Sequence, residues 1–271
     1  MPDPTSAVPS AVTDSDPAAA IDPAPAAAVD HAGGAPSRFR LAAPAVVVPV
    51  VVSILLAVLA FLADSVDGAP GRLMTALTSS GFAWGLAAFL TAFSAPTLRR
   101  AVITATALLT ATTLLYYLLI LLVSRRWSGG YLEDGSSADM FGLLSLAIMT
   151  AAWLVASLIA GPLFAVLGHA VRTAPRPRAA LALGTASGLL LAQSVYEMAA
   201  VPPWRFPDIP FSDGVLLPDI TLTVLPLAVL AILATLHRLW PSWPLLITSL
   251  AAASAIGATL WSIPNTIATL L

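Results

Sequence analysis

The stretch Ala179–Ala200 reads AALALGTASGLLLAQSVYEMAA, and it decides the fold class of this chain. Its only charged residue is Glu197, which lies near the far end. About 20 helical residues cross the ~30 Å hydrocarbon core of a membrane, so the stretch predicts a transmembrane helix. The next segment, Val201–Pro218, is rich in proline and is the longest loop that we expect between two apolar spans.

The whole chain has the composition of a membrane protein. Of its 271 residues, 58% are hydrophobic and 10% are charged, whereas about 25% of residues are charged in soluble proteins. Further apolar runs match Ala179–Ala200 in length. We therefore predict an all-α, polytopic transmembrane bundle over residues 41–271, with about seven spans at roughly 41–63, 73–95, 101–123, 141–168, 179–200, 220–236 and 244–263.

Two features indicate how the chain is oriented. Residues 1–40 are rich in proline, alanine and aspartate and lack apolar periodicity, which predicts a disordered tail. If this tail is cytoplasmic, most of the 12 basic residues, all of them arginine, fall in cytoplasmic segments. Short cytoplasmic loops attract arginine, so we predict a cytoplasmic N-terminus in a multi-pass protein of the cell (plasma) membrane.

The most basic of these loops contains Arg172, Arg176 and Arg178. The simpler interpretation is that these residues are the orientation signal itself. The alternative is contact with anionic lipid headgroups, so the predicted partner is the lipid bilayer. The net charge of −2 gives no indication of nucleic-acid binding.

Missing residue types exclude several kinds of chemistry. The chain has no cysteine, which excludes disulfides and thiolate nucleophiles, and no lysine, which excludes a Schiff base or a P-loop. Thr185-Ala186-Ser187-Gly188 departs from the G-x-S-G motif of rhomboid-type proteases at its first position. No histidine lies at mid-membrane depth to serve as a base, so we expect no enzyme, no metal and no cofactor.

A polar stripe lies near the end of the 179–200 helix. Gln193 and Ser194 are four and three residues before Glu197, so the three share one face. The stripe is a candidate contact for an ion, a proton or a substrate, because ionisable residues are costly in spans. The alternative is an interfacial carboxylate that reaches water. Glu197 lies about 27 Å along the helix from Arg178, close to the outer surface, which favours the alternative.

Pairs of glycines four residues apart predict close helix packing. Gly184 and Gly188 form one pair, and Gly81 and Gly85 form another in the second span. Packing within one chain is the simpler interpretation, and dimerisation is the other. Nine residues separate Gly188 from Glu197, which at 100° per residue places them on opposite faces of the helix. A helix with a packing face on one side and a carboxylate on the other is poorly suited to facing lipid, so we expect it to be central in the bundle.

Prolines inside two spans predict kinks. Gly161-Pro162 lies in the long fourth span, and Pro226 lies in the sixth. A proline in a helix removes one backbone donor, so it kinks the helix or ends its regular part.

Several short motifs give the chain a resemblance to a family of small multi-span actinobacterial membrane proteins, a domain family of unknown function. The resemblance covers roughly residues 73–200. It rests on Ser80-Gly81-x-x-Trp84 with Ala88-Phe89, Tyr116-Tyr117, Trp153, Gly161-Pro162 and Glu197. It implies a multi-pass membrane protein and transfers no activity or catalytic residue.

The sequence therefore supports two functions. The first is a non-enzymatic structural or accessory component of the membrane, favoured by the packing faces and by the lack of a catalytic set. The second is a small-solute or ion-coupled permease, favoured by the polar stripe on the fifth span and by the proline-interrupted spans. It ranks second because carriers bind near the midplane and Glu197 lies too close to the surface.

Overall fold

The structure is a computed structural model that describes residues 43–200 and 216–270, with side chains over 47–200 and 217–262. The predicted tail, 1–40, and most of the loop Val201–Pro218 lie outside the described residues. In the described part, the regular elements are helices: α1 (Ala43–Ala63), α2 (Gly68–Thr78), α3 (Gly81–Ser94), α4 (Leu98–Leu119), α5 (Asp139–Thr173), α6 (Arg176–Ala200), α7 (Leu216–Leu236) and α8 (Trp243–Leu270). A π-helical turn, Ile120–Ser124, ends α4, and a 3-10 turn, Trp240–Ser242, precedes α8.

Six apolar helical segments in the described residues are long enough to cross a membrane. They are Gly68–Ser94, Leu98–Ser124, Asp139–Thr173, Arg176–Ala200, Leu217–Leu236 and Trp240–Ser262. Large apolar side chains such as Val155, Leu158 and Ile159 on α5 are exposed, as expected of a lipid-facing surface. These observations confirm an all-helical protein with the features of a membrane protein.

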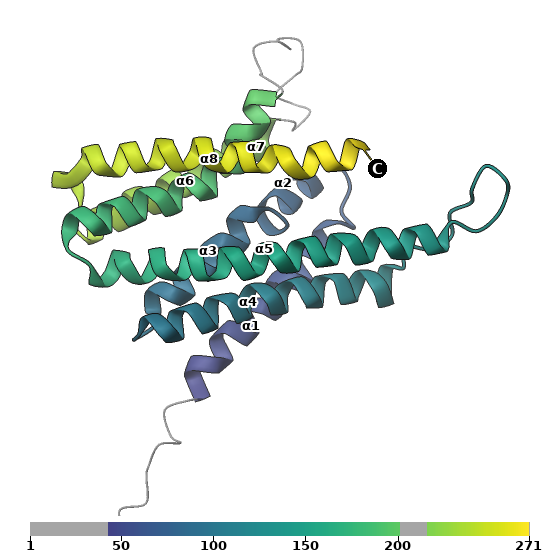
Figure 1. The fold of residues 1–271 in the computed structure, drawn as a ribbon, viewed down its shortest axis with the longest axis horizontal. Coiled ribbons are helices and arrows are strands. Elements are labelled where there is room, and N and C mark those ends of the chain that lie inside the picture. Colours follow the sequence, from purple (N-terminus) through teal and green to yellow (C-terminus); the bar gives the residue numbers. More distant parts are fainter. Residues whose placement is uncertain (1–42, 201–215, 271) are drawn as a thin grey trace, which may run out of the picture. The chain divides into compact units, whose positions relative to one another are not determined.

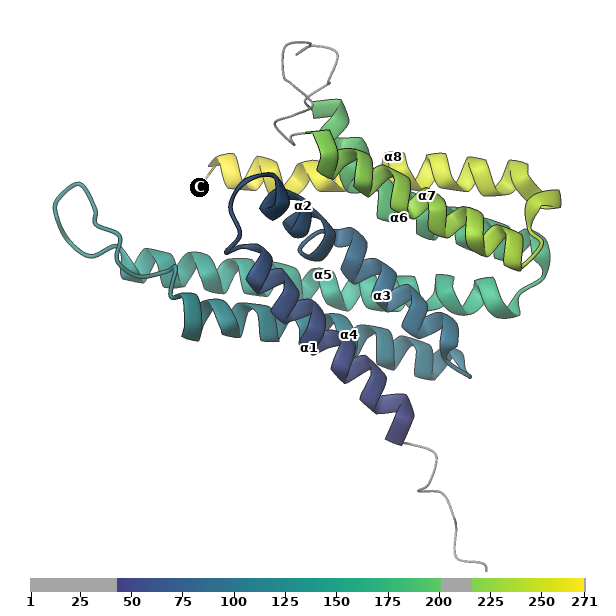
Figure 2. The ribbon, with the colours of Figure 1, turned by 180° about the vertical axis from the view of Figure 1, so that it is seen from behind.

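The α6 helix is the most buried of these segments. In its most apolar stretch 67% of the residues are buried, against 28% or less in the others. It packs against α8, α7, α5 and α3, and Figures 1 and 2 show α6 and α8 side by side. This burial agrees with the prediction of a central helix.

Glycines allow the close contact between α6 and α8. A Cβ atom added to Gly184 would collide with the carbonyl oxygen of Leu246, and one added to Gly188 would lie 2.8 Å from the Cβ of Ala253. The second predicted pair lies on α3, where Gly81 faces Trp261, and a Cβ on Gly85 would lie 2.9 Å from the Phe164 ring. All four glycines therefore contact other helices of the same chain.

The predicted second span is wrong in one respect, because the structure divides it. The segment expected as one helix over residues 73–95 is α2 and α3, separated at Ser79 and Ser80. Ser80 has extended backbone angles, with φ −78° and ψ 157°. The indole Nε1 of Trp84 donates to the carbonyl oxygen of Thr78 at 2.7 Å, so a side chain from α3 satisfies the end of α2.

Counting the π-helical turn as part of α4, three other helices differ from their predicted bounds by at least four residues at one end, and one of them is α8, which ends at Leu270 rather than 263. The α5 helix covers Asp139–Thr173 rather than 141–168, and it continues through Pro162. Pro162 therefore does not end the helix. The α7 helix begins at Leu216 rather than Ile220 and continues through Pro226. The kinks expected at Gly161-Pro162 and at Pro226 stay predictions.

Candidate functional site

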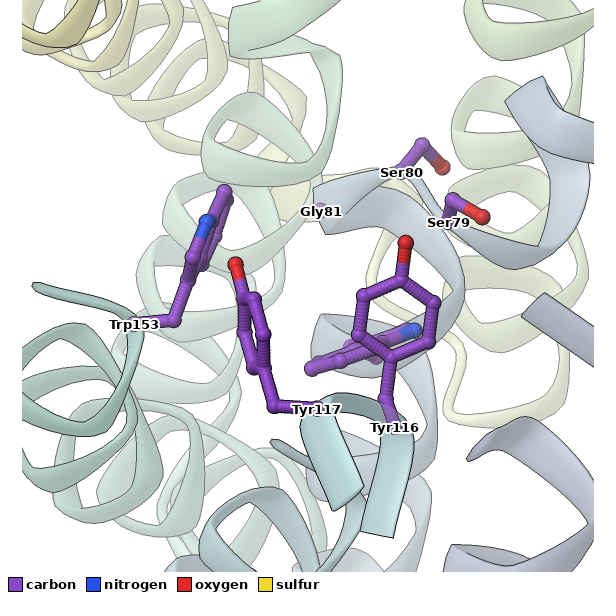
Figure 3. A pocket seen from close by; sticks show the side chains of 7 residues that line it. Ser79, Ser80, Gly81, Tyr116, Tyr117 and Trp153 are labelled. Carbon is purple, nitrogen blue, oxygen red and sulfur yellow. The ribbon is translucent and has the colours of Figure 1, made fainter. Parts of the chain in front are cut away.

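A pocket lies where the second span is broken. Its volume is about 180 Å³, and it opens partly to the outside. Four helices contribute: α2 and α3 through the residues at the break, α4 through two adjacent tyrosines, and α5 through a tryptophan. Figure 3 shows the two tyrosines, the α5 tryptophan and the break arranged around this space. The lining residues are Ser79, Ser80, Gly81, Trp84, Tyr116, Tyr117 and Trp153.

The break occurs near the middle of the apolar segment Gly68–Ser94. Tyr117 on α4 is 17 residues after Arg100, and Trp153 on α5 is 19 residues before Arg172. The pocket therefore lies about 26–29 Å from the arginine-rich ends of these helices, at the same level as Glu197. The first backbone N–H groups of α3, beginning with that of Gly81, have no carbonyl partner within the helix. The positive end of the α3 dipole therefore lies at the pocket.

A chain of hydrogen bonds connects the break to the predicted polar stripe. The N–H group of Gly81 donates to Oε1 of Gln193 at 3.3 Å. Nε2 of Gln193 then donates to Oε1 of Glu197 at 2.9 Å. Two of the three predicted site residues on α6 are thus joined to each other and to the start of α3.

The third predicted residue, Ser194, has a different set of contacts. It is fully buried, and its hydroxyl pairs with the hydroxyl of Thr223 on α7. Thr223 also donates to the carbonyl oxygen of Asp219 at 2.7 Å. Ser194 therefore joins α6 to α7 and does not reach the pocket.

Asp219 was given no role from the sequence, because it falls between the predicted loop Val201–Pro218 and the predicted span 220–236. The structure places it in the first turn of α7, where its carboxyl group lies near that of Glu197. Two acidic side chains therefore come together between α6 and α7.

Aromatic rings form the walls of the pocket. The rings of Trp84 and Tyr116 are 6.2 Å apart, and those of Tyr116 and Tyr117 are 5.2 Å apart, both pairs edge to face. Edge-to-face pairs contribute about 0.5–1.5 kcal/mol beyond burial, so these rings support one another. The π-helical turn begins three residues after Tyr117, and such turns often occur at functional sites.

Several polar groups of the lining residues lack a partner within the part of the chain that the structure describes. The hydroxyls of Ser79 and Ser80 are buried without a hydrogen bond, and Ser80 does not cap α3. No hydrogen bond involves the hydroxyl of Tyr117 or Nε1 of Trp153 among the side chains described. Buried polar groups are nearly always satisfied, so these are groups that a bound molecule could satisfy.

By contrast, the hydroxyl of Tyr116 has a partner. It donates to Oδ2 of Asp64 at 2.8 Å, and the same oxygen forms an ion pair with Arg126 at 3.1 Å. Asp64 follows α1 and Arg126 follows the π-helical turn. Asp64 and Arg126, which do not line the pocket, therefore hold the Tyr116 ring in its place in the pocket wall.

The arginines predicted to contact lipid lie at the end of α5 and the start of α6, away from the pocket. Arg172 donates to the carbonyl oxygen of Ser94, the last residue of α3, at 3.2 Å. Arg176 and Arg178 are exposed. Contact with anionic lipid stays a prediction for these three residues. Within the described residues, no three histidine or acidic side chains come together as metal ligands.

The pocket itself was not predicted. Several lining residues occur in the motifs of the suggested family resemblance, but that resemblance gave them no role. Comparisons with protein-family models, curated proteins and solved structures find no match to this chain. The actinobacterial family resemblance therefore stays a prediction, and the function must be argued from the site.

Proposed function

We propose that this protein crosses the plasma membrane seven times, with its N-terminus in the cytoplasm. The six segments of spanning length are supplemented by α1, whose 21 residues extend about 32 Å at 1.5 Å per residue. The arginines at the start of α4, at the end of α5 and at the start of α6 fall on the same predicted side. Their number on that side supports the orientation.

We infer that its function is to carry a small solute, and that the pocket at the break is the solute site. The observation that carries this inference is the pocket beside an interrupted membrane helix. Transporters commonly bind their substrates where a membrane helix is discontinuous, because the free backbone groups there can contact the solute. The pocket lies toward the predicted outer side, as Glu197 does, so the proposed site would be reached from that side and Glu197 need not contact the solute.

Glu197 has a second role in this proposal. Its carboxyl group lies near that of Asp219 on α7 and is joined through Gln193 to α3. A proton bound or released by the carboxyl pair can therefore alter the contacts among α6, α7 and α3. This arrangement supports ion coupling by the proton.

The competing function is a structural or accessory membrane component. The glycine contacts between α6 and α8 favour it, because they serve packing and not binding. Both functions are non-enzymatic. The pocket is lined by hydroxyl groups and aromatic rings and has no histidine or carboxylate to act as a base.

Reconstitution into liposomes tests the carrier function. Proteoliposomes would be incubated with a defined mixture of small neutral, anionic and cationic solutes, and the internal content measured by mass spectrometry. We expect at least one solute to enter faster than into protein-free liposomes. Ser79→Trp, which fills the pocket, should abolish this entry, whereas Ala252→Trp on the exposed face of α8 should not.

Glu197→Gln distinguishes coupled from uncoupled transport in the same assay. It should leave downhill entry in place and remove accumulation driven by a pH gradient. Entry equal to that of protein-free liposomes for every solute, with a correctly folded protein, would contradict the carrier function and favour the structural one.

A further inference from the structure

We propose that the solute is a small uncharged molecule bearing several hydroxyl groups, of the size and chemistry of glycerol. This inference rests on the proposed carrier function and specifies what the pocket holds. Its three components are the volume of the pocket, the lack of a charged side chain in its lining, and the polar groups that have no partner.

The volume sets the size. A cavity of about 150 Å³ holds one benzene molecule, which has six heavy atoms. The pocket, at about 180 Å³, is only slightly larger. A solute of roughly six heavy atoms therefore fills it, whereas a longer molecule would extend through its opening.

The lining disfavours ions. It includes no arginine or histidine to pair with an anion and no carboxylate to pair with a cation. The nearest carboxylate contact is that of Asp64 with Tyr116, and Arg126 already neutralises that carboxylate. The aromatic rings alone could attract a cation, and the break adds no net charge to pair with one, because the negative end of α2 and the positive end of α3 meet there. An ion would lose its hydration without a counter-charge, which is costly in a membrane.

The unpartnered groups require a polar solute. The buried hydroxyls of Ser79 and Ser80 have no partner in the described residues, and no hydrogen bond joins the half-buried Tyr117 hydroxyl or Nε1 of Trp153 to any side chain described. In Figure 3 the serine hydroxyls are directed away from Trp153, and one χ1 rotation would change their direction. A purely hydrocarbon solute would leave the two buried serine hydroxyls unsatisfied at a cost of about 1–3 kcal/mol each.

A polyol can contact both the polar groups and the aromatic rings that line the pocket. Its hydroxyls donate and accept, which matches tyrosine and serine hydroxyls and the donor-only indole N–H group. Its C–H groups pack on the aromatic rings of Trp84 and Tyr116, which gain from losing contact with water. No other small neutral class offers as many hydroxyl groups for its volume.

The experiment compares three probes of similar size: glycerol, glycerate and choline. Glycerol entry into proteoliposomes is followed by stopped-flow light scattering, and the entry of glycerate and choline by mass spectrometry. We expect saturable glycerol entry above protein-free liposomes and no entry of the two ions. Tyr117→Phe and Trp153→Phe should each weaken the apparent affinity for glycerol about three- to tenfold, as for one lost neutral hydrogen bond.

Matched controls separate the outcomes. Tyr131→Phe changes an exposed loop tyrosine and should leave glycerol entry unchanged. Entry of glycerate or choline without glycerol would overturn the assignment of an uncharged polyol and leave the carrier function in place. If no probe enters and the wider solute mixture is also inactive, the carrier function itself fails. Equal glycerol entry in wild type, Tyr117→Phe and Trp153→Phe would overturn the role given to these two groups.

Discussion

Oε1 of Gln193 on α6 accepts a hydrogen bond at 3.3 Å from the backbone N–H group of Gly81, the first residue of α3. A helix break in a membrane leaves backbone groups without partners, and these groups cost several kcal/mol each in lipid. The contact from Gln193 satisfies one of them. Through this contact α6, the most buried of the described spans, stabilises the break between α2 and α3.

Gln193→Leu should therefore destabilise the break. The substitution removes the acceptor for Gly81 and the donor to Glu197, so we expect a loss of about 1–3 kcal/mol of stability together with weaker glycerol binding. Thermal unfolding in detergent and glycerol entry would measure the two effects. Thr248→Val is the control, because Thr248 is exposed and its hydroxyl bonds only to its own helix. Equal behaviour of the two variants would contradict the role of Gln193.

Gly188→Ala tests the contact between α6 and α8. The added methyl group would lie 2.8 Å from the Cβ of Ala253 and closer still to the Leu250 carbonyl oxygen. Overpacking of this kind costs about 1–3 kcal/mol. Gly130→Ala is the matched control, since its Cβ would make an ordinary 3.4 Å contact with Ala138. A Gly188→Ala melting temperature as high as that of the control would mean that α8 packs elsewhere.

A double-mutant cycle measures the contact between Tyr116 and Asp64. Tyr116→Phe and Asp64→Asn each disturb the 2.8 Å hydrogen bond, so their combined effect on stability should be smaller than the sum. We expect a coupling free energy of about 1–2 kcal/mol, as for a hydrogen bond to a charged group. Additive effects in chemical unfolding would show that Tyr116 is not held by Asp64.

Membrane orientation can be tested with single cysteines, because the natural chain has none. A membrane-impermeant maleimide added to intact cells should label Ser136→Cys, in the exposed loop before α5, and should not label Pro175→Cys, between α5 and α6. Labelling of Pro175→Cys alone would reverse the orientation. Labelling of both from outside would exclude an α5 helix that crosses the membrane.

Apolar length and glycine spacing were sufficient to predict the helices and the central place of α6. Both are local properties, since lipid requires each span to satisfy its own backbone. The polar stripe was also predicted, but the helices that it contacts were not. Helical phase shows that Gln193 and Glu197 share a face, and only the packing of helices shows that this face meets α3 and α7.

The break and Asp219 could not be predicted, for physical reasons that differ. The break depends on Trp84 bonding Thr78 and on Gln193 bonding Gly81, and the second contact joins residues far apart in the sequence. Asp219 follows Pro218 and so fell outside the predicted span 220–236. A proline is tolerated in the first turn of a helix, where it removes no hydrogen bond, and α7 begins before it.

Fluorine NMR of the protein labelled with 5-fluorotryptophan can show directly whether a solute binds at the break. Trp84 and Trp153 line the pocket, whereas Trp240 and Trp243 are exposed beside the start of α8. Each signal would be assigned by a Trp→Phe substitution, and glycerol would then be titrated. We expect saturable shifts of the Trp84 and Trp153 signals while those of Trp240 and Trp243 stay in place. Unmoved Trp84 and Trp153 signals, or equal shifts of all four, would contradict solute binding at the break.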